Sequence, residues 1–122
     1  MEKYIIIACG GAIGAVARVI LGDALNRWGS MPYGTMVVNS IGCLLIGFIL
    51  GIYMEHPEWP QWGKYLIVAG GLGAFTTFST FIFELLELMV KSSIIDSLIY
   101  SGVQIIGGLL LCAIGIQLGR LL

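Results

Sequence analysis

The sequence predicts an all-α integral membrane protein of four transmembrane helices, the third of them broken near its centre. Hydrophobic residues make up 58% of the 122 residues and charged residues only 11%, with a mean hydropathy of +0.99. Apolar stretches of about 20 residues, the length that crosses a bilayer as a helix, recur along the chain. They cover residues 4–25, 34–54, 65–90 and 97–119. This composition excludes a soluble domain, and we expect a single domain over residues 1–122.

Charge and chemistry-bearing residues exclude several classes of function. The formal net charge of -1 gives no indication of a nucleic-acid partner. The three cysteines, Cys9, Cys43 and Cys112, lie in apolar stretches without a CxxC pair, so we expect inert thiols. The one histidine, His56, lies in a connection between spans. No acid neighbours a candidate serine or cysteine nucleophile in the spans, so the sequence does not predict an enzyme.

The first span repeats small residues every four positions, at Gly10, Gly14 and Gly22, with Arg18 in the same series. Small residues let helices approach closely in lipid, so the glycines predict a packing face. A guanidinium inside a span faces protein or a water-filled cavity, or reaches toward the interface. Arg18 would therefore either draw an anion into a vestibule or act structurally, by pairing with Asp23 or binding carbonyl groups at the break in the third span.

The second span places Asn39 on a face with small residues, because Asn39, Cys43, Gly47 and Gly51 recur every four positions. Asn39 should therefore point at another helix or a cavity rather than at lipid. An amide offers two donors and two acceptors. Two roles stay open for Asn39: an interhelical hydrogen bond, or a donor to an anion in a pore.

The third span contains the string on which the function depends, GGLGAFTTFSTF over residues 70–81. Glycine and β-branched threonine weaken a helix, and hydroxyl groups can satisfy backbone groups freed by an interruption. We expect the helix to break here, exposing a helix N-terminus that attracts anions and carbonyl groups that hold a small cation. Further along, Glu84 would be a vestibule residue, a proton-linked group or a partner of Arg18.

The fourth span has one smaller and more polar face, formed at four-residue spacing by Tyr100, Gln104, Gly108 and Cys112. This face would line a pathway or form a packing seam. The basic residues outside the spans are nearly balanced between the two sides. Lys3, Lys64 and Arg120 share one side, and Arg27 and Lys91 the other. Because a fixed orientation normally shows a clear excess, we expect insertion both ways and an antiparallel two-fold dimer, unless lipid or the insertion machinery fixes the chain.

The motifs in the first three spans resemble those of one family, the small bacterial fluoride channels called Fluc or CrcB. The resemblance covers the whole chain and its four-span layout. It is carried by Gly10-Gly11, Gly14-Ala15 and Arg18, by Gly34-Thr35, Val38-Asn39 and Gly42, and by Gly73 with Thr76-Thr77-Phe78-Ser79-Thr80-Phe81. The last string is the specific one, since GxxxG pairs are common in membrane helices.

The resemblance implies an antiparallel, dual-topology homodimer in the cell inner (plasma) membrane. It would export fluoride passively and so lower fluoride toxicity. Phe78 and Phe81 match phenylalanines whose ring edges line the pore, and Asn39, Thr35, Ser79, Thr80 and Tyr100 match its polar donors. Arg18, Glu84 and Gln104 would be vestibule or supporting residues.

The resemblance also implies a structural sodium ion, which is not transported. It would be held at the dimer centre by the backbone carbonyl groups of Gly73 and Thr76. The family often has a serine and a threonine where this chain has Gly108 and Cys112, a departure that bears on the polar track. The alternative function is a dual-topology small multidrug/proton exchanger, which needs an acid deep in the first span, where this chain has Arg18.

Overall fold

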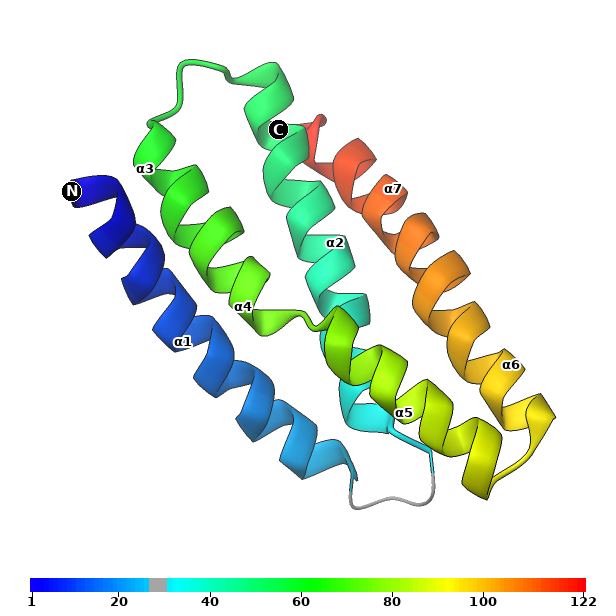
Figure 1. Cartoon of the computed structure of the whole chain (residues 1–122). Coiled ribbons are helices and arrows are strands. Elements are labelled where there is room, and N and C mark those ends of the chain that lie inside the picture. Colours follow the sequence, from blue (N-terminus) through cyan, green and yellow to red (C-terminus); the bar gives the residue numbers. More distant parts are fainter. Residues whose placement is uncertain (27–30) are drawn as a thin grey trace.

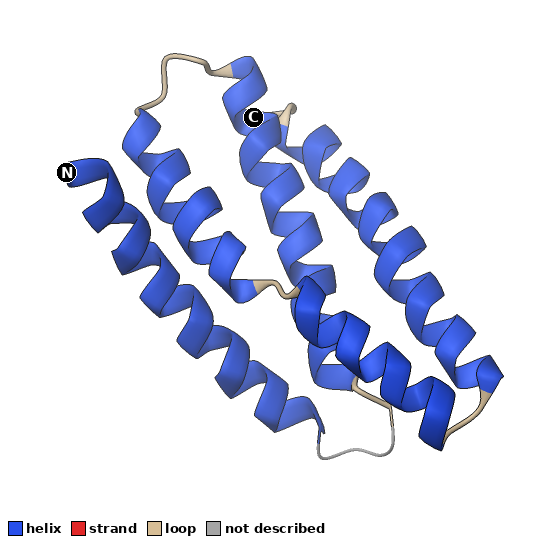
Figure 2. Cartoon of the chain, in the orientation of Figure 1, coloured by secondary structure: helices blue, strands red, loops and turns tan. Residues whose placement is uncertain are grey.

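The computed structural model describes residues 1–26 and 31–122, and its regular elements within these ranges are all helical (Figure 2). In chain order they are α1 (Glu2–Leu25), α2 (Tyr33–Glu55), α3 (Gln61–Gly63), the π-helical η2 (Lys64–Leu72), α4 (Gly73–Phe75), α5 (Phe78–Lys91), α6 (Ile94–Gly102), the π-helical η3 (Val103–Gly107) and α7 (Gly108–Gly119). Four helical segments in the described residues are long and apolar enough to cross a membrane. They are Glu2–Leu25, Tyr33–Glu55, Gln61–Lys91 and Ile94–Gly119.

These segments confirm the predicted all-α class and the four spans. Both chain ends and the connection between α2 and α3 lie at the same end of the bundle (Figure 1), as an even number of crossings requires. Arg27, one of the basic residues counted on the opposite side, lies outside the described residues.

The third segment divides its contacts between two neighbours because the extended Thr76–Thr77 connection displaces its second half sideways from its first (Figure 1). η2 and α4 pack along α1, whereas α5 packs along α6. α2 and α7 form the other large helix pair, and the second half of the third segment runs to one side of the first half rather than in line with it (Figure 1). The third segment therefore changes its neighbouring helix at the break, between α4 and α5.

Glycine backbones form the helix contacts, as the GxxxG spacing predicts. A Cβ atom added at Gly10 would overlap Leu66 O, and one at Gly14 would overlap Gly71 O. On the other pair, Gly47 of α2 lies against the backbone of Cys112 in α7. Carbonyl groups occupy the space that side chains would need, so these contacts bring helix backbones together directly.

The predicted break lies within the string, between Phe75 and Phe78. Thr76 (φ -81°, ψ 158°) and Thr77 (φ -150°, ψ 117°) are extended, and both sides of the break are helical. The hydroxyl group of Thr76 donates to Leu72 O at 3.0 Å, and the hydroxyl oxygen of Thr77 accepts from the Thr80 N–H at 3.3 Å. The threonines thus close the end of one half-helix and the start of the next, as expected for hydroxyl groups at an interrupted span.

The end of the bundle that holds both termini carries the aromatic and basic residues expected at a membrane interface. The Lys64 ammonium lies 4.6 Å from the centre of the Tyr53 ring, and the His56 ring stacks on Trp59. His56 Nδ1 lies 3.0 Å from Glu58 Oε1. The hydrogen bond with Glu58, and then a second bond to the backbone oxygen of Leu122, raises the pKa of His56 above its ordinary value.

Candidate functional site

The break is held by a side-chain amide from another span. Asn39 Oδ1 accepts from the Thr77 N–H at 2.9 Å, and Asn39 Nδ2 donates to Thr77 O at 3.0 Å. The amide therefore pairs with both backbone groups of one extended residue, much as a neighbouring β-strand would. This confirms the expectation that Asn39 faces another helix, and gives it the interhelical hydrogen bond.

A chain of hydrogen bonds continues from Asn39 to the fourth segment and back to α5. Asn39 Nδ2 also donates to Gln104 Oε1 at 3.1 Å, and Gln104 Nε2 donates to the Tyr100 hydroxyl at 3.3 Å. The Tyr100 hydroxyl donates to Glu84 Oε2 at 2.5 Å. Thr35 donates to Glu84 Oε1 at 2.9 Å. Five residues singled out from the sequence thus form one polar network.

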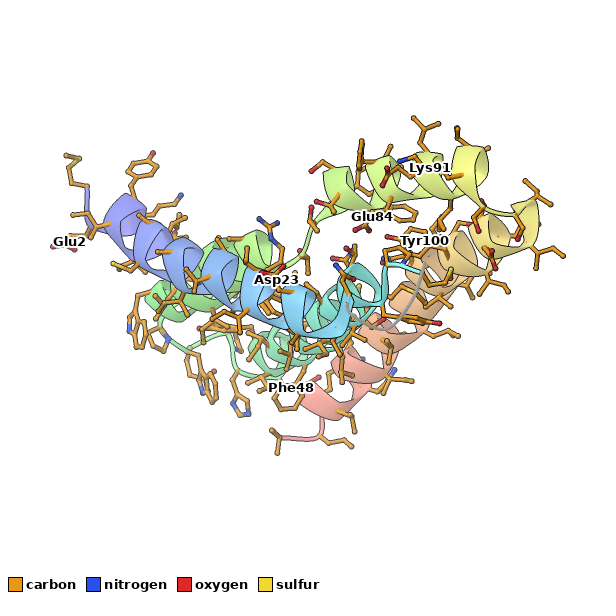
Figure 3. All side chains as sticks on the ribbon, turned by 90° about the horizontal axis from the view of Figure 1, so that it is seen from below. Glu2, Asp23, Phe48, Glu84, Lys91 and Tyr100 are labelled. Atoms are coloured by element: carbon orange, nitrogen blue, oxygen red, sulfur yellow. The ribbon has the colours of Figure 1, made fainter. Side chains whose placement is uncertain are left out.

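The network bears on one of the roles considered for Glu84, that of a partner of Arg18. Its two carboxylate oxygens each accept a hydroxyl hydrogen, from Thr35 and Tyr100. The side chains of Glu84 and Tyr100 meet between α5 and the fourth segment (Figure 3). The ion pairs of residues 1–26 and 31–122 do not include Glu84. Glu84 is therefore the acceptor at the end of the network.

Arg18 adopts one of its predicted structural roles. Its Nη1 atom donates to Thr76 O at 3.4 Å, so it binds a carbonyl group at the break. Arg18 also lines a groove of about 270 Å³ with Asn26, Thr80 and Glu84, between α1, α2 and α5. The Arg18 guanidinium therefore lies both at the break and beside a small, partly polar groove, so its structural role and its vestibule role are compatible.

The two phenylalanines of the string lie together but in different surroundings. Phe81 is 4% exposed and packs on Tyr100, with ring centres 5.5 Å apart. Phe78 lies 5.7 Å from Phe81 and is 74% exposed. Ser79 and Thr80, which follow Phe78 in the first turn of α5, are exposed as well. This part of α5 therefore presents the Phe78 ring and two hydroxyl residues on the outside of a single chain.

A groove of about 340 Å³ connects these features. It is lined by the phenylalanines, by the break and by the α2 and fourth-segment residues nearest to it: Asn39, Gly42, Cys43, Ile46, Leu72, Thr76, Thr77, Phe78, Phe81, Gln104 and Ile105. Its walls combine amide groups, a backbone break and aromatic rings. Such a mixture of weak donors and apolar surface suits a dehydrated anion better than a hydrated one.

The carbonyl groups predicted to hold sodium lie at the end of the first half-helix. The N–H group of Thr77, which would bond to Gly73 O in a continuous helix, is instead paired with Asn39. Gly73 is exposed, and Thr76 O is contacted by Arg18. Carbonyl oxygens at the negative end of a helix fit a hard cation chemically. Two oxygens from one chain leave most of a coordination shell to other donors.

The fourth segment shows why this chain has Gly108 and Cys112 on its polar face. A Cβ atom at Gly108 would lie 3.2 Å from Cys43 Sγ, and the Cys112 backbone packs on Gly47. These positions therefore belong to the packing seam with α2, whereas Gln104 lines the groove. The seam is continuous, since η3 and α7 both contact α2.

Sequence reasoning missed three residues at this site. It did not assign Thr77 a partner, Gly42 a role, or Cys43 a place in the groove. Gly42 is buried because the Thr76 methyl group occupies the space of its missing side chain. The only signal was that Gly42 and Cys43 follow Asn39 within one helical turn.

The fold and the site define a class: a multi-pass membrane protein whose interrupted helix brings polar groups into the interior of the bundle. The family described as "CrcB-like protein, Camphor Resistance (CrcB)" matches residues 5–116. The chain belongs to this family.

Curated relatives named "Fluoride-specific ion channel FluC" match nearly the whole chain. The protein from Bordetella petrii is 40% identical over 93% of this chain and 88% of its own length. The protein from Nitratidesulfovibrio vulgaris is 39% identical over 99% of both chains. The resemblance stated from the motifs is therefore confirmed at the level of the family.

Proposed function

We infer that this chain forms a fluoride-selective channel that lets the anion leave the cytoplasm passively. The observation that carries the proposal is the groove beside the break, where Asn39 and Gln104 meet the rings of Phe78 and Phe81. The names of the relatives support the same anion.

The physical task is to replace the hydration of a small anion. Amide and hydroxyl groups donate hydrogen bonds, and the edges of aromatic rings carry partial positive charge. The first turn of α5 is the positive end of that helix, and of its N–H groups the one of Thr80 is already bonded to the Thr77 hydroxyl oxygen. Several weak donors in a row bind the ion without trapping it. Larger anions such as chloride would fit less well between the rings.

The driving force needs no pump. Hydrogen fluoride enters neutral from an acidic outside and dissociates in the cytoplasm. The inside-negative potential then contributes about 2.3 kcal/mol per charge per 100 mV to outward movement of the anion. Passive export of this kind would place the protein in the plasma membrane and would lower fluoride toxicity.

An antiparallel homodimer completes the proposal. Phe78, Ser79 and Thr80 face outward from a single chain, and a second chain would enclose them. The two carbonyl oxygens of Gly73 and Thr76 would meet the same pair from the partner. A sodium ion bound there would supply positive charge that holds the carbonyl ends of the two half-helices together.

The dual topology rests on the balance of charge outside the spans. Lys3, Lys64 and Arg120 lie at one end, and Lys91 and Arg27 belong to the other by sequence. Cysteine crosslinking between copies of opposite orientation would support the antiparallel dimer. Finding parallel pairs alone would reject it.

Fluoride efflux from liposomes tests the channel. Purified protein is reconstituted in vesicles loaded with fluoride, a potassium gradient with valinomycin sets the potential, and a fluoride electrode follows release. We expect rapid fluoride efflux and almost no chloride efflux from vesicles loaded with chloride. Vesicles that retain fluoride, or that release both anions equally, would reject the proposal.

The ring edges have a matched control on the same helix. Phe81→Ile should slow fluoride efflux, because Phe81 lines the groove. Phe83→Ile makes the same chemical change at a ring that is 61% exposed and does not line it, and should leave efflux near the wild-type rate. Equal rates for the two variants would remove Phe81 from the pathway.

A further inference from the structure

The hydrogen bonds around the break fix the direction of both amide groups, beginning from the backbone. A backbone N–H only donates and a backbone carbonyl only accepts, so Thr77 determines which end of the Asn39 amide faces which group. Oδ1 must face the Thr77 N–H, and Nδ2 must face Thr77 O, as the distances of 2.9 and 3.0 Å have them. The reversed amide would place Asn39 Nδ2 against the Thr77 N–H, donor against donor, and Oδ1 against Thr77 O, acceptor against acceptor.

The second N–H group of Asn39 is then directed at Gln104. An NH₂ group has two hydrogens, and the one that does not go to Thr77 O goes to Gln104 Oε1 at 3.1 Å. Both donors of the Asn39 amide are therefore engaged within the chain. An anion that took a hydrogen bond from Asn39 would have to displace Gln104 or release the break.

The same reasoning fixes Gln104. Because its Oε1 accepts from Asn39, its Nε2 faces the Tyr100 hydroxyl at 3.3 Å. Tyr100 in turn directs its hydrogen to Glu84 Oε2. The hydroxyl hydrogen of Thr35 also goes to Glu84. The hydrogens of the predicted donors Asn39, Thr35 and Tyr100 are thus all directed at partners inside the network.

One amide hydrogen is left over, and it belongs to Gln104. Nε2 uses one hydrogen for the Tyr100 hydroxyl, and no other bond from Nε2 occurs within residues 1–26 and 31–122. Gln104 is half-buried and lines the groove with Phe78 and Phe81. Its position on η3 also lies in a π-helical turn, a local widening that often occurs at functional sites.

We propose that Gln104 Nε2 is the side-chain amide donor that meets fluoride in the groove, and that Asn39 is a positioning residue that holds both Gln104 and the break. This rests on the proposed channel function and assigns the donor within it. Gln104 therefore contacts the ion, whereas Asn39 acts through Gln104 and Thr77.

Two substitutions of Gln104 separate this assignment from a role for Asn39 as the donor. Gln104→Met keeps the length of the side chain and removes both the donor and the acceptor. If Gln104 is the donor, fluoride efflux at low fluoride falls about tenfold or more, as expected for loss of a hydrogen bond to a charged group. If Asn39 is the donor, Gln104→Met frees its second hydrogen, and efflux is unchanged or rises.

Gln104→Glu adds a readout that a purely structural role would not change. The carboxylate still accepts from Asn39, but it has no hydrogen to donate and repels an anion. Protonation removes the charge that repels the anion and supplies one O–H donor, so efflux through this variant should rise as the pH is lowered from 7.5 toward 5.5. The wild-type glutamine does not titrate, and protein-free liposomes correct for leakage of hydrogen fluoride.

A matched control and the wild type make each outcome decisive. Gln117→Met makes the same change at an exposed glutamine of α7 that does not line the groove, and should conduct like the wild type. Efflux through Gln104→Met within about twofold of the wild type, or Gln104→Glu without pH recovery, overturns the assignment and leaves the channel proposal standing. A wild-type protein that passes no fluoride overturns both.

Discussion

Replacing Asn39 with leucine tests whether one amide holds the broken helix together. The substitution removes the hydrogen bonds of 2.9 and 3.0 Å to Thr77 and the bond of 3.1 Å to Gln104 Oε1, and it leaves the N–H and C=O groups of Thr77 without their partner. Each partly buried backbone group left unsatisfied costs about 1–3 kcal/mol, so we expect a loss of about 2–6 kcal/mol in the free energy of unfolding. The side-chain volumes are similar, so the loss reports polar pairing more than packing.

Two measurements in detergent or bicelles test this prediction. Equilibrium unfolding gives the change in stability, and hydrogen exchange reports the protection of the Thr77 amide. Asn39→Asp keeps the acceptor for the Thr77 N–H, so it should retain that protection while losing the bond to Thr77 O. Ser40→Ala, on the next residue of α2, should match the wild type.

The refuting result is a small effect. Interhelical side-chain hydrogen bonds in membranes contribute about 0.6 kcal/mol on average, because the unfolded chain also finds partners. If Asn39→Leu lowers the free energy of unfolding by only that much and the Thr77 amide remains protected, other groups stabilise the break and Asn39 does not.

Three further predictions concern packing and charge. Gly14→Ala should destabilise the bundle, because the added Cβ overlaps a backbone carbonyl, whereas Gly22→Ala should be tolerated because nothing lies within 4 Å; equal melting temperatures would contradict this. Gly108→Ser should lower the melting temperature, because its Cβ would lie 3.2 Å from Cys43 Sγ, and Cys43→Ala in the same chain should restore it; a double variant no more stable than the single one would count against the contact. The pKa of His56 is raised from 6.5, so its hydrogen bonds stabilise the fold below about pH 6.5 and lose that effect as the pH rises through the folded-state pKa. The melting temperature of His56→Gln should therefore differ from that of the wild type in mild acid, and the two should converge in base.

The lower edge of the His56 window follows from its partner. The pKa of Glu58 is lowered from 4.5, first by its own backbone N–H and then by His56. The Glu58 carboxylate therefore contributes above about pH 4.5 and loses its contribution as the pH falls through its folded-state pKa. The pair should contribute most between these two values.

The sequence alone determined the class, the spans and the position of the break. Apolar length and composition report how a segment partitions into lipid, which is a local property and needs no partner. The break at Thr76–Thr77 was predictable for a similar reason, because three glycines and a run of hydroxyl residues weaken the helix where they occur. The close helix contacts at Gly10 and Gly14 followed from their spacing.

Only the tertiary structure decided which group pairs with which. From the sequence, Glu84 had three possible roles and Arg18 several, since partners such as Thr35 and Tyr100 come from other spans. The rotation of each helix about its axis and the sideways offset between the two halves of the third segment set those distances. The fold therefore determined that Asn39 binds the break and that Gln104 keeps an amide hydrogen for the groove, because hydrogen-bond partners are chosen by position in space rather than by position along the chain.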